Sequence, residues 1–174
     1  LLYRIPNLLH GSVPVGKDDK DNVVVRTAGK KPKFSFAPKG HAEILQSLRL
    51  LDMDRAAKAA GHGFYYLMGD AAILDMALQR FALDTLRKKG FTAVEPPLML
   101  NEETFSAVTD QETFSNQSYK IEGENLRLIG TAEHPLGGLY RDEVLLQEHL
   151  PVLLAGVSPC FRKEVGAHGK YTRG

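Results

Sequence analysis

Only one cysteine, Cys160, occurs in the sequence, so neither an internal disulfide nor a zinc site built on paired cysteines can form within it. No apolar run reaches the roughly 18 residues that a membrane-spanning helix requires. The first residues also lack the basic region, long apolar stretch and small-residue cleavage site of a secretory signal. These absences exclude a disulfide-stapled secreted domain, a zinc finger and a membrane protein, and they lead us to expect a cytosolic protein.

An excess of charge of one sign is missing as well. Lys and Arg number 22 and Asp and Glu number 21, which leaves a net charge of +1. Dedicated nucleic-acid-binding proteins usually carry a strong positive field, so net charge gives no indication of RNA binding here. The hydrophobic share of 43% and the charged share of 25% are typical of a globular protein, and 174 residues suffice for one domain or part of one.

Internal repeats and low-complexity segments are also absent, and helix and strand patterns make up the chain. Residues 1–40 combine short apolar runs with polar turns, which predicts extended arms and loops, and residues 41–61 fit two short helices. The strongest helix pattern begins at Asp70 as N-cap and stops at Gly90. Its apolar residues fall on one face: Ile73, Leu74, Ala77, Leu78, Phe81 and Leu86.

The second half of the chain is dominated by strand patterns. Residues 91–95 read as a strand that Pro96 and Pro97 close, because two prolines remove two ladder donors. Asn101 caps a short helix, residues 118–121 and 126–129 form a hairpin, and residues 152–157 form a buried strand. Helices alternate with hairpin-like strands without regular βαβ spacing. This order predicts an α+β fold with an antiparallel β-sheet flanked by helices.

A glycine-rich phosphate loop of either common type is missing, so side chains must hold any nucleotide that binds. Arg162 suits that task, since its planar fork can grip a phosphate with two hydrogen bonds. Glu164 follows two residues later and would point to the same face of a strand. Taken alone, the two residues read more simply as an ion pair on an exposed strand, and His168 as an exposed loop histidine.

Thr131 and Glu133 follow the predicted hairpin. In one interpretation Thr131 is the N-cap of a helix with Pro135 in its first turn and Glu133 as a first-turn carboxylate. In the other, the hydroxyl and the carboxylate face a pocket and bind a small ligand with an ammonium group. The chemistry of the residues leaves the two interpretations about equal.

Three segments resemble a known family. Residues 90–99 resemble motif 1 of the class II aminoacyl-tRNA synthetases, with Pro97 at the signature proline, and residues 160–164 with the loop to Gly174 resemble motif 2. Thr131, Ala132 and Glu133 are similar to the Thr-Ala-Glu element of the seryl-tRNA synthetases. The resemblance covers nearly the whole chain in the right order. It implies activation of serine with ATP and transfer to tRNA(Ser), and also to tRNA(Sec).

The resemblance also implies roles for single residues. Thr131 and Glu133, with Ala132 between them, would line the serine pocket and contact the hydroxyl and ammonium ends of serine, in either order. Arg162 would bridge the ATP α-phosphate and the serine carboxylate as the catalytic residue. The remaining ATP contacts would come from Lys163, Glu164 and Arg173.

Partners follow from the same resemblance. The loop with Gly166, His168 and Lys170 would approach the tRNA acceptor end, and the helix and strand of motif 1, including Pro97, would form much of a homodimer interface. The alternative for that helix is packing into the core of one chain. Mg²⁺ would assist ATP, with its ligands expected downstream of the chain.

The resemblance also predicts the domain organisation of the chain. Residues 1–62 are the expected lead-in segment and residues 63–174 the catalytic core through motif 2, without the tRNA-binding helical arm or motif 3. The sequence lacks an initial Met and stops in a polar stretch, so we expect neighbouring segments on both sides. Two alternatives remain: a ligase that charges a carrier protein, and a non-catalytic paralogue that serves as an interaction module.

Overall fold

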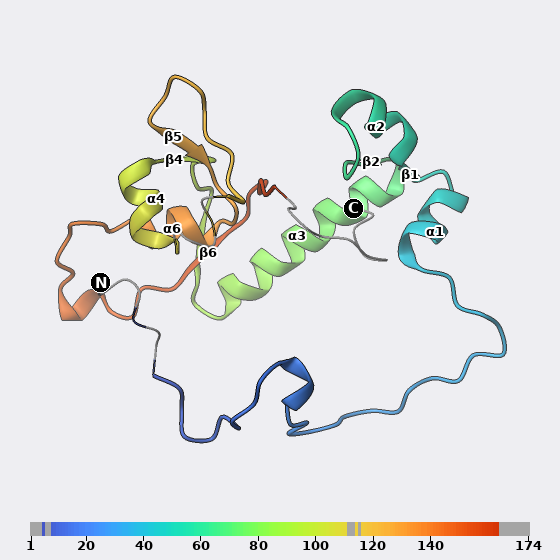
Figure 1. The fold of residues 1–174 in the computed structure, drawn as a ribbon, viewed down its shortest axis with the longest axis horizontal. Helices are drawn as coiled ribbons and strands as arrows, with labels where there is room; N and C mark the ends of the chain where they lie inside the picture. The colour runs from blue at the N-terminus through green and yellow to red at the C-terminus, as the bar shows by residue number, and fades with distance from the viewer. Residues whose placement is uncertain (1–4, 6–7, 111–113, 115, 164–174) are drawn as a thin grey trace. The chain divides into compact units, whose positions relative to one another are not determined.

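The computed structural model describes residues 5, 8–110, 114 and 116–163 (Figure 1). The chain divides into two units, Leu1–Lys39 and Gly40–Gly174. The predicted functional boundary between residues 62 and 63 is a different kind of division and stays a prediction. No helix in the described ranges is long and apolar enough to cross a membrane.

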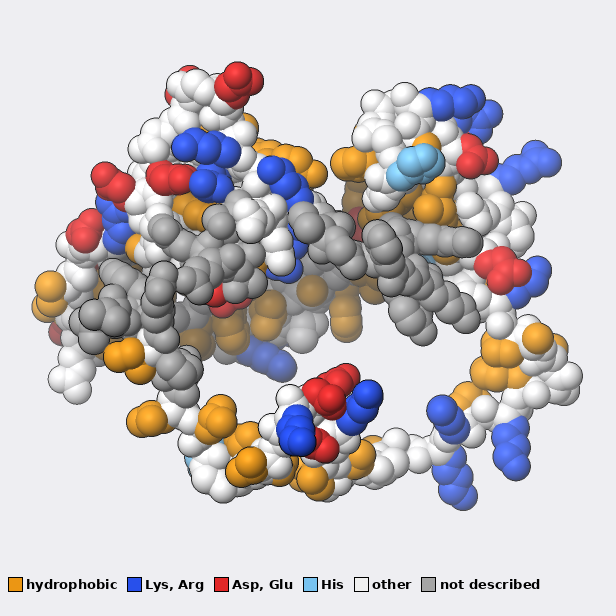
Figure 2. All heavy atoms as spheres, in the orientation of Figure 1, with side chains coloured by type: hydrophobic (Ala, Val, Ile, Leu, Met, Phe, Trp, Pro, Cys, Tyr) orange, Lys and Arg blue, Asp and Glu red, His pale blue; other side chains and the backbone are white. Residues whose placement is uncertain are grey.

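The first unit has little regular structure in its described part, as the sequence predicts. The short 3-10 helix η2, Asp19–Asp21, is capped by Asp18, whose carboxylate accepts a 2.8 Å hydrogen bond from the Lys20 N–H. Apolar side chains lie on the surface of this unit between charged ones (Figure 2), and Val24 and Val25 are among the exposed ones.

The second unit begins with the two predicted short helices, α1 (His41–Ser47) and α2 (Met53–Ala60). Asp52 caps α2 by accepting from the Arg55 N–H at 2.8 Å. Two short strands that the sequence did not reveal, β1 (Leu51–Asp52) and β2 (Tyr66–Leu67), form an antiparallel pair around α2. They are too short for an alternating pattern to appear.

The long helix α3 spans Asp70–Lys88. Its N-cap is Gly69 with φ of 54°, not Asp70 as predicted, because a positive φ suits glycine; Asp70 instead places its charge in the first turn, near the positive end of the helix dipole. The apolar side chains of Ile73, Leu74, Leu78 and Phe81 are 58% to 70% exposed. The alternative of packing into the core of this chain is therefore wrong for this face.

Beyond α3, strands pair in two separate places. β3 (Thr92–Val94) runs parallel to β6 (Leu154–Gly156), and β4 (Met99–Asn101) runs antiparallel to β5 (Leu126–Leu128). A bridge between Lys120 and Arg127 confirms the predicted hairpin. The α+β class is confirmed. In the described ranges, however, the strands form three two-stranded pairs, one of them parallel, because β3 and β6 lie far apart in the chain and no hairpin constrains their direction.

The core sits between β4, β5 and the helix α4 (Glu102–Val108), which Asn101 caps as predicted by accepting from the Thr104 N–H at 2.8 Å. Leu100, Phe105 and Ile129 are buried there, with Phe114 packed against them. The helix α6 (Glu133–Gly138) and the 3-10 helix η3 (Gln147–His149) complete the unit (Figure 1). This core supports the segment from the end of β5 to the start of α6, which contains the residues predicted to bind serine.

Candidate functional site

Two backbone segments meet at the end of β5. The Ile129 N–H donates to the Leu98 carbonyl at 3.0 Å, and the Ile129 carbonyl accepts from the Phe161 N–H at 2.9 Å. The Lys163 N–H donates to the Gln117 carbonyl at 2.7 Å. Residues 161–163 therefore lie beside the loop after β5, although the structure does not assign them to the strand that was predicted for Arg162. Hydrogen bonds to two different segments, rather than one continuous ladder, hold them.

Arg162 is anchored at the inner end of its guanidinium. Its Nε donates to the Gly130 carbonyl at 2.8 Å, and its Cζ lies 5.7 Å from the centre of the Phe114 ring. The side chain is exposed, and no described carboxylate forms an ion pair with it. The anchor fixes the guanidinium through Nε and leaves the terminal nitrogens for a ligand. This is the arrangement that a phosphate or carboxylate would need. Glu164, the other member of the predicted ion pair, lies outside the described residues.

Thr131, Ala132 and Glu133 line a common hollow of about 540 Å³. The other lining residues come from the start of β3, from α6 and from the segment that enters β6: Phe91, Leu136, Gly137, Val152, Leu153, Leu154 and Gly156. Glu133 is exposed and has no basic partner among the residues that the structure describes. A hydroxyl and an unpaired carboxylate at one open hollow can bind an ammonium group and a hydroxyl.

The structure bears on the first interpretation of Thr131, that of an N-cap. Ala132, not Thr131, is the N-cap of α6, and no side chain caps that helix. The Thr131 hydroxyl accepts only a long 3.4 Å hydrogen bond from the Glu133 N–H, because the residue sits one position too early for a cap. Thr131 is therefore not the N-cap of α6, and the interpretation that its hydroxyl binds a ligand stays a prediction.

Arg162 does not line the hollow that Thr131 and Glu133 share. It reaches the same loop through Gly130, the residue directly before Thr131. The structure thus brings the residues predicted to bind serine together, and a hydrogen bond to Gly130 places Arg162, the residue predicted to bind phosphate, beside their loop.

Sequence reasoning missed His134, which follows Glu133. The ring is 6% exposed and meets the rings of Phe105 and Phe114 edge-on, at centre distances of 5.7 and 5.6 Å. Its Nδ1 accepts from the Gly130 N–H at 3.4 Å. Burial, followed by the positive charge of Arg162, lowers the pKa of His134 below its ordinary value of 6.5. Partners from distant positions bury the ring, so no local sequence signal could have revealed it.

Other predicted residues are distributed as follows. The Lys163 ammonium lies 5.4 Å from the Tyr119 ring centre, and the side chain is exposed. Pro97 is exposed next to the buried Pro96. Five predicted residues lie outside the described ranges: Glu164, Gly166, His168, Lys170 and Arg173.

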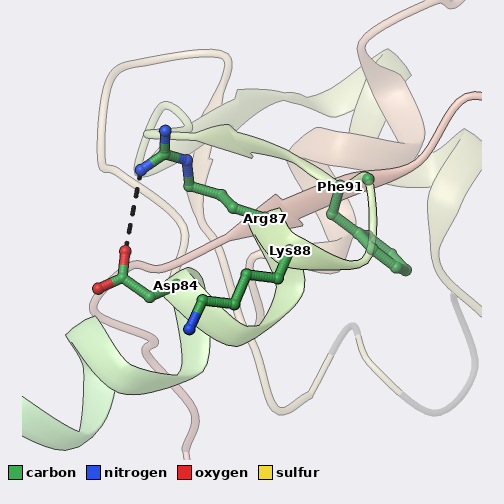
Figure 3. Close-up of a pocket in the computed structure, with 5 residues that line it drawn as sticks. Asp84, Arg87, Lys88 and Phe91 are labelled. Carbon is green, nitrogen blue, oxygen red and sulfur yellow. Dashed lines mark ion pairs between the residues drawn. The ribbon is translucent and has the colours of Figure 1, made fainter.

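A second hollow of about 490 Å³ lies at the C-terminal end of α3 (Figure 3). It is lined by Asp84, Arg87, Lys88, Gly90 and Phe91. Asp84 and Arg87 pair across 3.8 Å, which partly neutralises the basic end of the helix. None of the predicted site residues lines it, so it is not the candidate site.

The metal that the resemblance implies finds no ligand set in the described ranges. No group of three His, Cys, Asp or Glu side chains there lies close enough together to hold a metal ion. Mg²⁺ that acts with a nucleotide is usually held by one or two carboxylates together with the substrate phosphates. No step involving Mg²⁺ can be assigned to these residues.

Comparison with known proteins finds similar proteins over nearly the whole chain. No family model matches the chain. A serine–tRNA ligase from Methanocella arvoryzae is 50% identical over 173 residues, which is 99% of this chain and 41% of that protein. The seryl-tRNA synthetase of Pyrococcus horikoshii, solved in complex with ATP, superposes with a TM-score of 0.93 and 46% identity, covering 99% of this chain and 43% of that one.

A second solved structure agrees. The cytoplasmic serine–tRNA ligase of Naegleria fowleri in complex with AMP superposes with a TM-score of 0.89 at 33% identity, over 99% of this chain and 42% of that one. The chain spans about two fifths of the length of the relatives that it matches. Over the whole of its own length, the chain is therefore a homologue of the serine–tRNA ligases in both sequence and fold.

Proposed function

We propose that this chain carries part of the serine and ATP site of a serine–tRNA ligase, which activates serine and transfers it to tRNA(Ser) and also to tRNA(Sec). The observation that carries the proposal is the position of Arg162, anchored through Nε on Gly130 directly beside the hollow of Thr131 and Glu133. The support from relatives is their names and the ATP and AMP in two solved structures.

In the proposed reaction the serine carboxylate attacks the α-phosphorus of ATP. The new bond joins the carboxylate oxygen to phosphorus, and pyrophosphate leaves with the electron pair of the broken P–O bond. A terminal ribose hydroxyl of tRNA then attacks the carbonyl carbon to form the ester C–O bond, its proton passes to water, and AMP leaves with the electron pair of the broken C–O bond. No nucleophile of the protein is required, so the chain contributes position and charge.

Each described residue has a part in this scheme. Arg162 binds the α-phosphate and the serine carboxylate and offsets the charge that grows on the phosphate. Thr131 and Glu133, with Ala132, bind the hydroxyl and ammonium ends of serine. Lys163 adds a positive charge on the same segment. Glu164 and Arg173 complete the proposed ATP contacts, and Gly166, His168 and Lys170 the tRNA contacts. Mg²⁺ would neutralise ATP phosphates, with ligands beyond those described.

A homodimer and a cytoplasmic location complete the proposal. The exposed apolar face of α3 and the exposed Pro97 support the dimer, because no described residue covers that face. The location rests on the cytoplasmic ligase from Naegleria fowleri.

The test is serine-dependent exchange of pyrophosphate into ATP, measured on the complete gene product. Arg162→Ala should abolish exchange, and Arg26→Ala, an exposed arginine of the first unit, is the matched control that should leave it unchanged. Retained exchange in the Arg162 variant would contradict the assigned role.

The same protein separates the two alternatives. Exchange without transfer to tRNA, but with transfer to a carrier protein, would favour a carrier-protein ligase. No exchange by the wild type would favour a non-catalytic paralogue.

A further inference from the structure

Gly130 is held from both sides by side chains of the candidate site. Its N–H donates to His134 Nδ1 at 3.4 Å, and its carbonyl accepts from Arg162 Nε at 2.8 Å. Both polar groups of one buried residue are thereby tied to ring and guanidinium nitrogens. A shift of His134 moves the peptide units that position Arg162.

The space around Gly130 shows the same coupling. A Cβ atom built there would lie 3.4 Å from His134 Cε1 and 3.6 Å from Arg162 Nε. The imidazole and the guanidinium thus pack against the same face of the glycine at van der Waals distance. The Nε end of Arg162 and the imidazole therefore share the space beside Gly130.

Phe114 provides a second connection. Its ring lies edge-on to His134 at 5.6 Å and under the Arg162 guanidinium at 5.7 Å. On the other side of the imidazole, Phe105 of α4 packs edge-on at 5.7 Å. His134 is therefore fixed by the core and contacts Arg162 through both the backbone and an aromatic ring.

We propose that His134 is a positioning residue that sets the orientation of the Arg162 guanidinium through Gly130 and Phe114. It acts through Arg162 and touches no reacting atom, and the inference rests on the proposed function of Arg162. An accepting Nδ1 requires a neutral ring with its proton on Nε2. The charged groups near the ring are Arg162 and Glu133, and α4 contributes the uncharged Phe105; burial and Arg162 lower the His134 pKa and favour the neutral form.

Two variants separate positioning from packing. His134→Phe keeps an aromatic ring between Phe105 and Phe114 but removes the acceptor. His134→Asn loses the ring but offers an amide oxygen near the position of Nδ1. Both are compared with wild type in the complete gene product by pyrophosphate exchange and by thermal unfolding.

We expect the two variants to differ in which quantity changes, the KM for ATP or the Tm. His134→Phe should raise the KM for ATP roughly threefold to tenfold, the range for one hydrogen bond, while its Tm stays close to wild type. His134→Asn should keep the KM near wild type even where its Tm falls. An unchanged KM in the Phe variant, or equal KM defects in both variants that follow their Tm, would overturn the proposal.

A structural readout keeps the inference separate from the proposed activity. With arginine labelled at ¹⁵Nε, the Nε–H of Arg162 should exchange slowly with water in the wild type and in His134→Asn, and faster in His134→Phe. Wild-type protein without pyrophosphate exchange would contradict the proposed function alone. Equal Nε–H exchange rates in all three proteins would contradict the positioning role.

Discussion

Arg127 on β5 and Glu102 at the start of α4 form a two-bond ion pair, with Arg127 Nε and Nη2 donating to the two carboxylate oxygens of Glu102 at 2.5 and 2.7 Å. The Arg127 side chain is only 15% exposed, and its Cζ lies 5.3 Å from the Phe105 ring centre. Its Nη1 also donates to Ser118 Oγ at 2.6 Å. The arginine joins the hairpin, α4 and the core beneath the candidate site.

Removal of this arginine should cost more than removal of an exposed one. Arg127→Ala leaves Glu102 without its partner and deletes the contact with Phe105. We therefore expect a loss of about 2 kcal/mol in the free energy of unfolding, measured by urea denaturation. Arg80→Ala, which breaks an exposed pair with Asp84 on α3, is the control and should cost clearly less, because solvent screens an exposed ion pair. Equal losses would contradict the structural role of Arg127.

The same pair should make stability depend on acid pH. The hydrogen bonds from Arg127 hold the pKa of the Glu102 carboxyl below its ordinary value of 4.5. A carboxyl with a lowered folded-state pKa stabilises the protein above its unfolded-state pKa, and this contribution is lost as pH falls through the folded-state pKa. Urea midpoints should therefore fall below about pH 4.5, and part of that fall should be absent in Glu102→Gln. An identical pH dependence in wild type and variant would exclude this pair as a source.

Local sequence patterns predicted most helices and strands well. They could not predict contacts between residues that lie far apart in the sequence. The Asn101 cap, the two short helices and the stop at Gly90 depend on neighbouring residues, so the sequence could indicate them. The partners of Gly130 could not be predicted in this way. His134, Phe114 and Arg162 reach it from three segments, and only the tertiary fold brings them together.

The two interpretations of the α3 face have a related cause. Periodicity showed an apolar face, and the structure shows that the described residues do not bury it. Sequence periodicity reports which residues share a face, but it does not report whether the same chain or a second copy covers that face.

The exposed face of α3 should support self-association. Phe81 is 70% exposed, so Phe81→Lys should weaken a dimer at least tenfold without unfolding the chain, as measured by sedimentation velocity across a concentration series. Gln79→Lys introduces the same side chain on the opposite side of the helix and serves as the control. A monomeric wild type, or equal effects of both variants, would contradict an interface on this face.

Glu133 should act on serine rather than on ATP. Its carboxylate is exposed at the hollow and has no basic partner among the residues described, so its removal leaves the fold with few lost contacts. Glu133→Gln keeps the shape and removes the charge, and we expect the KM for serine in pyrophosphate exchange to rise roughly tenfold or more, since a charge-assisted hydrogen bond is lost. The KM for ATP should change by less than about threefold, because Arg162 is anchored independently on Gly130. Glu143→Gln, an exposed glutamate outside the hollow, is the matched control. A rise in the KM for ATP with an unchanged KM for serine would place Glu133 on the nucleotide instead.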